Sequence, residues 1–267
     1  MKTKLLILLS LTLPFAFDAQ AGSATWNLSP TTGDWNTATN WDPNTVPNGP
    51  SDVATFAASN QNRVSFSDVT EVDSIVFNPG ARSFTITNAP FHEVTISGAG
   101  IVNNSGITQH FVSDKGSGSP ADQADSPAFP SITFTNNATA GSNTTFTING
   151  ANGELGVGGN VDFYDSTSAD HASFEIFGSR GYAYGTELGF YDSSTAANST
   201  ITIHELGRLQ VDGFESMPTL GDAVVTNTRG FIYLYTGASA GQATITNAGT
   251  MTVTGSETEI LENLSRV

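Results

Sequence analysis

The residues best suited to chemistry in this chain are carboxylates. Two carboxyl groups flanking a glycosidic bond are the machinery of glycoside hydrolysis, one as the acid and the other as base or nucleophile. Nothing in the sequence indicates that flanking geometry, so we interpret the acids as solvated turn residues and predict no catalytic residue. The candidates are Asp162, Asp165, Glu175, Glu187 and Asp192.

Two of these acids, Asp165 and Asp192, end the same short phrase, Phe-Tyr-Asp. If the phrases stack, the carboxylates lie close enough to repel each other unless they turn to water or share a cation. We therefore predict a weak calcium site at Asp165 and Asp192, and no other metal or cofactor. A zinc centre is not expected, because His92-Glu93 and His204-Glu205 lack a second histidine at the required spacing.

One serine-hydrolase motif occurs, the segment GASAG at 237–241, which matches G-x-S-x-G. That motif requires a strand-to-helix turn and a histidine later in the chain. No histidine follows Gly241. Because Ser239 also falls at a repeated position, we interpret it as a structural residue.

Four stretches with nearly the same phrase predict how such residues are positioned. Each has an apolar residue and its neighbour, a Ser/Thr-Ala step, a small polar turn and an alternating strand. One such unit cannot bury its own apolar face, so repeats of this size stack into solenoids. The phrase begins at Phe134, Phe163, Phe190 and Leu234, and the longer last gap leaves room for a weaker unit near Arg208.

Stacking turns aligned residues into ladders, because neighbouring strands lie about 4.8 Å apart. Adjacent residues of a strand point to opposite faces. The sequence therefore predicts a buried ladder, an exposed ladder and a row of tight corners. The members are Phe163, Phe190 and Leu234 inside, Tyr164, Tyr191 and Tyr235 outside, and Thr139, Ser168, Thr195 and Ser239 at the corners, each followed by an alanine.

Threonine triplets of the form Thr-x-Thr are a further pattern. Flat threonine ladders bind ice on some β-solenoids, and they need regular stacking of strands. The triplets start 48, 12, 55, 44 and 8 residues apart, which argues against ice binding. They lie at 85–87, 133–135, 145–147, 200–202, 244–246 and 252–254.

The chain begins like a secretory leader. Lys2 and Lys4 precede an apolar run at 5–17 and the small-x-small site Ala19-Gln20-Ala21, a pattern typical of a signal peptide. We expect cleavage near Ala21, secretion to the cell surface or medium, and no membrane span. The net charge of −16 argues against nucleic acid as a binding partner. The chain has no cysteine, so no disulfide bond stabilises the fold.

The remaining sequence indicates an all-β protein, a parallel β-helix, because short alternating runs are bounded by Asn, Gly, Pro or Asp. We predict a signal peptide at 1–21, a cap region at 22–57, and a β-helix at 58–267 with a protruding loop at about 115–130. The cap region holds all three tryptophans. The tryptophans are expected to cap the solenoid; the functional alternative is that their rings form an aromatic platform that binds sugars.

Three segments carry a resemblance to a known family: ATWNLSPTTGDWNTATNWDPNTVPNGPSDVATF, VTISGAGIVNNSG, and the recurring Ser/Thr-Ala phrase. They resemble autotransporter-associated passenger proteins of bacteria, which implies a right-handed parallel β-helix. That family includes adhesins and surface or matrix proteins. Autotransporters proper also carry a C-terminal outer-membrane barrel, whose strand series is not seen before Val267.

Together these features predict a secreted or cell-surface structural or adhesion-type β-helix protein without catalytic activity. The alternative is an extracellular β-helix that binds or cleaves polysaccharides. Expected partners are extracellular glycans, the cell surface or matrix.

Overall fold

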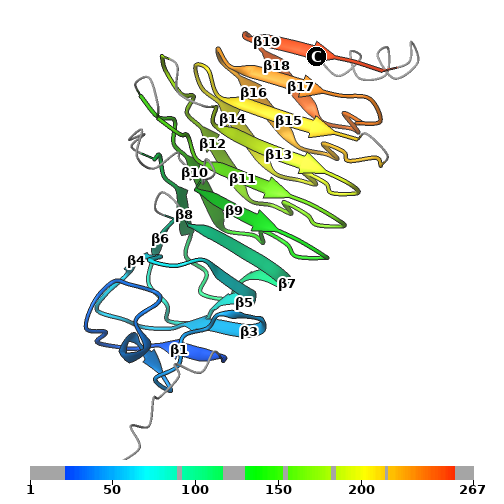
Figure 1. Ribbon diagram of the computed structural model, residues 1–267. Coiled ribbons are helices and arrows are strands. Elements are labelled where there is room, and N and C mark those ends of the chain that lie inside the picture. Colours follow the sequence, from blue (N-terminus) through cyan, green and yellow to red (C-terminus); the bar gives the residue numbers. More distant parts are fainter. Residues whose placement is uncertain are drawn as a thin grey trace, which may run out of the picture.

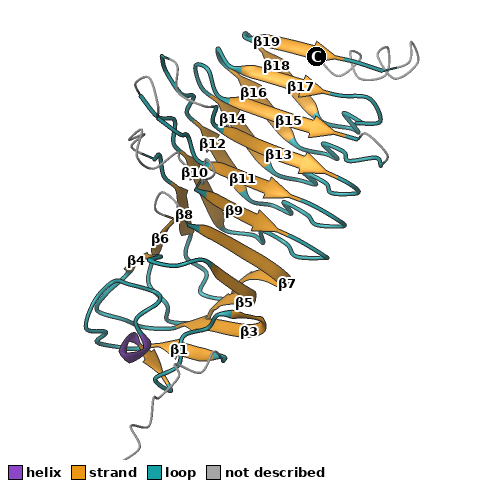
Figure 2. Ribbon diagram, in the orientation of Figure 1, coloured by secondary structure: helices purple, strands orange, loops and turns teal. Residues whose placement is uncertain are grey.

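The computed structural model describes residues 22–88, 92–116, 130–152, 156–181, 185–213 and 216–255, and these wind into a β-solenoid (Figure 1). Each coil runs along one sheet, turns sharply and returns along a second sheet (Figure 2). In that part of the chain the one helical element is a 3-10 turn, η1, at Ala38–Asn40. The all-β prediction is confirmed.

Sheet A has eleven strands among these residues and sheet B has eight. The sheet A strands, in spatial order, are β2 (Trp41–Asp42), β1 (Ala24–Trp26), β3 (Gly49–Phe56), β5 (Thr70–Phe77), β7 (Glu93–Asn103), β9 (Ser131–Phe134), β11 (Asn160–Phe163), β13 (Glu187–Tyr191), β15 (Arg208–Asp212), β17 (Phe231–Leu234) and β19 (Thr250–Val253). The sheet B strands are β4 (Arg63–Ser65), β6 (Thr85–Asn88), β8 (Gln109–Ser113), β10 (Thr144–Ile148), β12 (Ser173–Ile176), β14 (Thr200–Ile203), β16 (Val224–Asn227) and β18 (Thr244–Asn247).

Neighbouring strands in each sheet are parallel, apart from the antiparallel pair β1–β2 at the N-terminal end. The predicted leader lies outside the described residues, as does most of the predicted loop at 115–130. The division of the chain at residue 57 stays a prediction.

The predicted inner ladder is confirmed. Phe163 of β11 is opposite Phe134 and Phe190, with ring centroids 4.6 and 5.0 Å apart and nearly parallel rings. All three are buried. The ladder continues through Val211 to Leu234, because β15 is the weaker unit expected near residue 208.

The tryptophans form the core of the N-terminal cap. Trp41 packs edge-on against Trp26 and Trp35, with ring centroids 5.0 and 4.9 Å apart, and against Phe56 of β3 at 5.6 Å. Each indole N–H donates to a backbone carbonyl oxygen at 2.6 to 3.0 Å. All three rings are fully buried. They close the end of the solenoid, and their faces are not a platform for sugars.

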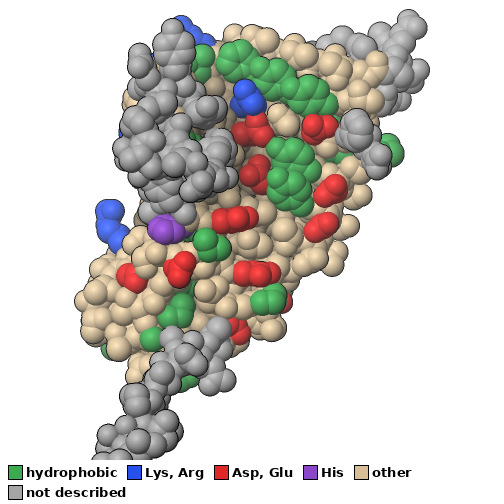
Figure 3. Space-filling model, in the orientation of Figure 1, with side chains coloured by type: hydrophobic (Ala, Val, Ile, Leu, Met, Phe, Trp, Pro, Cys, Tyr) green, Lys and Arg blue, Asp and Glu red, His purple; other side chains and the backbone are tan. Residues whose placement is uncertain are grey.

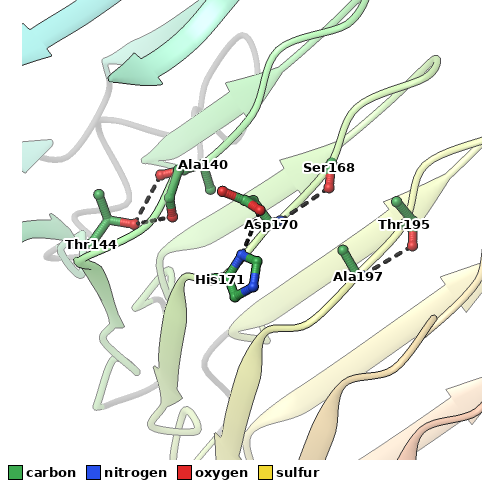
Figure 4. Close-up of polar contacts among 8 residues, drawn as sticks. Ala140, Thr144, Ser168, Asp170, His171, Thr195 and Ala197 are labelled. Carbon is green, nitrogen blue, oxygen red and sulfur yellow. Dashed lines mark hydrogen bonds and ion pairs between the residues drawn. The ribbon is translucent and has the colours of Figure 1, made fainter. Parts of the chain in front are cut away.

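The recurring Ser/Thr-Ala step forms the sharp corner between a sheet A strand and the following sheet B strand. The Ser168 hydroxyl accepts the N–H of Asp170, and the Thr195 hydroxyl accepts that of Ala197, both at 3.0 Å (Figure 4). The same contact recurs at the later corners. Parallel bridges join the corner residues Thr139, Ser168, Thr195, Thr219 and Ser239, which confirms the predicted row and adds Thr219 to it.

The corner needs a left-handed residue two positions after the hydroxyl. There φ is +51° at Asp170, +50° at Ala197 and +57° at Gly221. Between hydroxyl and left-handed residue a small apolar side chain enters the core, as Ala169 and Ala196 do. The repeated phrase therefore encodes one hydrogen-bonded turn.

Removing a ring from the inner ladder should destabilise the fold strongly. Phe163→Ala leaves a cavity between two stacked rings, so we expect a loss of about 3–5 kcal/mol in the free energy of unfolding. Urea titration followed by circular dichroism measures it. Val224→Ala on the exposed outer face is the control and should change stability by less than about 0.5 kcal/mol.

Placing glycine at one corner should stabilise the fold. A left-handed alanine costs about 1–2 kcal/mol, so Ala197→Gly should gain about 1 kcal/mol after part of this is offset by the entropy of the unfolded chain. The matched control is Ala196→Gly next to it. That residue is buried and has no positive φ, so its variant should unfold more easily; equal effects of the two changes would contradict the corner geometry.

Candidate functional site on the outer face of sheet A

The outer face of sheet A gathers most of the acids and tyrosines that the sequence singled out. Strand register places Glu187 opposite Arg208, and Asp162 opposite Gly189. Figure 3 shows hydrophobic side chains as a stripe over β17 and as a group near β11 and β13, with acidic and basic side chains among them. We call this set the sheet A face: Asp162, Tyr164, Glu187, Tyr191, Arg208, Gln210, Phe231, Tyr233 and Tyr235.

Glu187 is the centre of the polar contacts on this face. Its Oε1 accepts a hydrogen bond from the Tyr191 hydroxyl at 2.7 Å, and its Oε2 accepts one from Arg208 Nη1 at 3.1 Å. The Glu187 side chain is 14% exposed. The Arg208 guanidinium also lies over the ring of Tyr233, 5.4 Å from its centroid. The carboxylate thus links β13 to β15, and Arg208 extends the contact to β17.

Asp162 is the unusual acid of the face. It is only 8% exposed, and no described residue donates a hydrogen bond to its carboxyl group. A Cβ at Gly189 would lie 2.7 Å from Asp162 Oδ1 and 2.6 Å from the Tyr191 hydroxyl oxygen, so only glycine leaves room for both. Burial, and then the charges of Glu187 and Glu93, raise the pKa of Asp162 well above its ordinary value.

The predicted outer tyrosine ladder is present in part. Tyr164 and Tyr191 stack with centroids 4.8 Å apart and rings 13° from parallel. Asp212 lies between Tyr191 and Tyr235 in this row, since β15 intervenes. Burial and the nearby acids raise the pKa of Tyr164 to about 12, and burial with Glu187 raises the pKa of Tyr191 further. Both hydroxyls are therefore neutral hydrogen-bonding groups at neutral pH.

The two acids of the predicted calcium site occupy adjacent coils, as the repeat indicates. Asp192 Oδ2 accepts the N–H of Asp165 at 3.0 Å, and Asp165 Oδ2 accepts the N–H of Asn136 at 2.8 Å. Each carboxylate therefore stabilises the turn of the preceding coil. Calcium binding at Asp165 and Asp192 stays a prediction. The backbone N–H groups that donate to these carboxylates offset part of the repulsion between the two stacked negative charges.

The other candidates lie apart from the sheet A face. Glu175 is on the outer face of sheet B, where His204 Nε2 is 3.5 Å from its Oε2. The Ser239 hydroxyl accepts the N–H of Gly241 at a corner, in the same manner as Thr195. The structural interpretation of the GASAG segment is confirmed, because this serine belongs to a repeated turn.

Sequence reasoning missed the Arg208–Glu187 pair and the aromatic stripe of Phe231, Tyr233 and Tyr235. A usable signal was present in the segment GRLQVDGF. Aligning it as a full coil would have placed Arg208 beside Glu187.

Comparisons with models of protein families, with curated proteins and with solved structures found no match. Among the described residues, no helix is long and apolar enough to cross a membrane. The β-solenoid fold is consistent with the resemblance to passenger proteins, but membership of that family stays a prediction.

Neutralising Asp162 should stabilise the protein at neutral pH. Because the folded-state pKa of Asp162 is raised, its ionisation opposes folding, and stability is lost as pH rises from the unfolded-state value of about 3.9 through the folded-state value. Asp162→Asn should therefore raise the free energy of unfolding at pH 8 by about 1–3 kcal/mol, and by little at pH 3.5.

Thermal and urea unfolding at both pH values measure this difference. The control is Asp212→Asn, which removes one negative charge from the same face at a position that is not buried. A gain for Asp162→Asn that is independent of pH would contradict the assignment of the effect to its carboxyl group.

Proposed function

We propose that this chain is an exported, non-catalytic β-solenoid of the cell surface or matrix, whose sheet A face binds neutral glycan chains. The predicted leader supports export, and the repeated coils supply a rigid support for an adhesive surface. The relation to adhesive passenger proteins is part of the same proposal.

One observation carries the choice of ligand: a polar strip lies between two aromatic groups. Gln210 and Arg208 of β15 lie between the stacked tyrosines of the two preceding coils and the stripe on β17. Tyr164 is 37% exposed and the Arg208 side chain 42%. Aromatic rings pack against the apolar faces of sugars, while amide, guanidinium and hydroxyl groups bond the sugar hydroxyls. Adjacent strands are about 4.8 Å apart, so the aromatic groups on β13 and β17, with β15 between them, are about 9.6 Å apart across the sheet.

Charge favours a neutral glycan over an acidic one. The chain carries 25 acidic and 9 basic residues. On the sheet A face, Arg208 is already paired with Glu187. The acidic groups would therefore repel an anionic polysaccharide, and Arg208 is not free to offset this repulsion.

Cleavage of the glycan is the second candidate, and Asp162 is the observation that favours it. A carboxyl group with a raised pKa next to another carboxylate is the pattern of an acid and its partner. However, Asp162 is 8% exposed, and the ring of Tyr191 occupies the space above Gly189 beside it. A glycosidic oxygen would need to displace that ring, so the geometry favours binding.

We expect saturable binding of the protein to at least one immobilised neutral polysaccharide, such as a β-glucan, a mannan or a xylan. Tyr233→Ala and Gln210→Ala should each weaken binding about tenfold or more, equal to about 1.4 kcal/mol. The measurement is depletion from solution on the polysaccharide, with calcium present and absent.

Val224→Ala, on the opposite sheet, is the control and should bind like the original protein. Binding to acidic polysaccharides alone, or to none of the polymers, would overturn the proposal. Release of reducing ends, abolished by Asp162→Asn, would instead establish the cleavage alternative.

A further inference from the structure

The outer face of sheet B carries an ordered array of threonines that the sequence spacing concealed. Strand pairing places four of the six Thr-x-Thr triplets, those at 85–87, 145–147, 200–202 and 244–246, at equivalent positions of sheet B. Their spacing in the chain is irregular because coil lengths differ and because coils without a full triplet intervene. The irregular spacing in the chain thus gives an ordered but interrupted ladder, in which full triplets lie on every second strand. We call this surface the threonine face: Thr85, Thr87, Thr145, Thr147, Thr200, Thr202, Thr226, Thr244 and Thr246, with His110, Val112, Ser173, Glu175 and Val224 at equivalent positions.

Most hydroxyl groups of this face have no hydrogen-bond partner among the described residues. Of the nine threonines, Thr145 alone has a side-chain hydrogen bond among the described residues, 2.7 Å from His110 Nδ1. Thr200 and Thr244 are exposed, and Thr202 and Thr226 are half-buried. A row of hydroxyls that bond neither the backbone nor each other is available to hold water.

The array is held rigidly from beneath. The alternate residues of the same strands are buried, and the rings of Phe146 and Phe174 stack with centroids 4.9 Å apart. Ile201, Val225 and Ile245 continue that layer. Threonine is also branched at Cβ, which restricts its rotamers on a strand. The full triplets recur on every second strand, about 9.6 Å apart across the sheet, and the two threonines of each triplet lie about 6.6 Å apart along the strand. In the second row Thr202, Thr226 and Thr246 also lie on adjacent strands, about 4.8 Å apart.

The threonine face is also nearly free of charge, in contrast to the rest of the molecule. From β10 to β18 its ten outward positions hold one charged residue, Glu175, in a chain with 34 charged side chains. A charged polymer or lipid surface would find no complementary group there. A nearly neutral surface of hydroxyls and methyls instead suits ordered water, which offers hydrogen-bond donors and acceptors but no charge.

We propose that the threonine face binds ice. The hydroxyls anchor water molecules in a repeating pattern, and the methyl groups between them lie against the crystal surface without offering competing hydrogen bonds. Val224 preserves the shape of a threonine in this lattice, whereas Glu175 interrupts it. This proposal is independent of glycan binding, because it uses the opposite sheet.

The test is crystal growth in the presence of the full chain, observed as ice shaping, thermal hysteresis and inhibition of recrystallisation. We expect faceted crystals and a measurable hysteresis. Thr200→Tyr places a ring at the centre of the face and should remove most of this activity. Glu175→Thr should increase it, because it completes the second row between Thr147 and Thr202.

The matched control is Thr250→Tyr, an exposed threonine at the outer face of sheet A. It should leave the activity unchanged, and circular dichroism should show that all three variants keep the strand content. Unshaped crystals with the original protein would overturn the proposal. Equal losses for Thr200→Tyr and Thr250→Tyr would overturn it as well, because the activity would not then belong to sheet B.

Discussion

The stacked corner is the constraint on which the rest of this solenoid depends. At the repeated corners the chain passes from sheet A to sheet B through a left-handed residue, and a hydroxyl two positions earlier holds that turn, as at Thr195 and Ala197. Parallel bridges between successive corners then fix the register of both sheets. A shift of one residue at a corner would turn buried rings outward and outward side chains into the core. The small repeated phrase thus sets the register of the ladders in the coils that carry it.

Fixed register also explains how one core supports two unlike surfaces. The inner positions are mostly apolar, with a few buried polar residues such as Gln109 and Asn227, and the outer rows are free to differ. On sheet A those rows bring a carboxylate, a guanidinium and tyrosine rings into contact around Glu187. On sheet B they hold short, β-branched side chains with unpaired hydroxyls. The chemical difference between the faces arises from the outward residues, some of which, such as Glu187 and Arg208, also link neighbouring coils.

The sequence was sufficient for the parts of the structure that repeat with a recognisable phrase. Phe163 and Phe190 could be aligned, and their burial and the exposure of Tyr164 followed from strand alternation. Contacts involving β15 could not be predicted, because that coil lacks the phrase. The partnership of Arg208 with Glu187 therefore escaped notice. The burial of Asp162 escaped notice too, since it depends on the absence of a side chain at Gly189 in the next coil.

The antiparallel strand β2 lies beside β1 at the N-terminal end of sheet A, so the two ends of the solenoid differ. From the buried tryptophans onward, each described coil is laid on the one before it in chain order. Contacts lie mainly between neighbouring coils, and such quasi-one-dimensional structures propagate from a stable nucleus. A polypeptide that emerges from a membrane with its N-terminus first would complete the tryptophan cap before any coil, and each new coil would then find its template already folded.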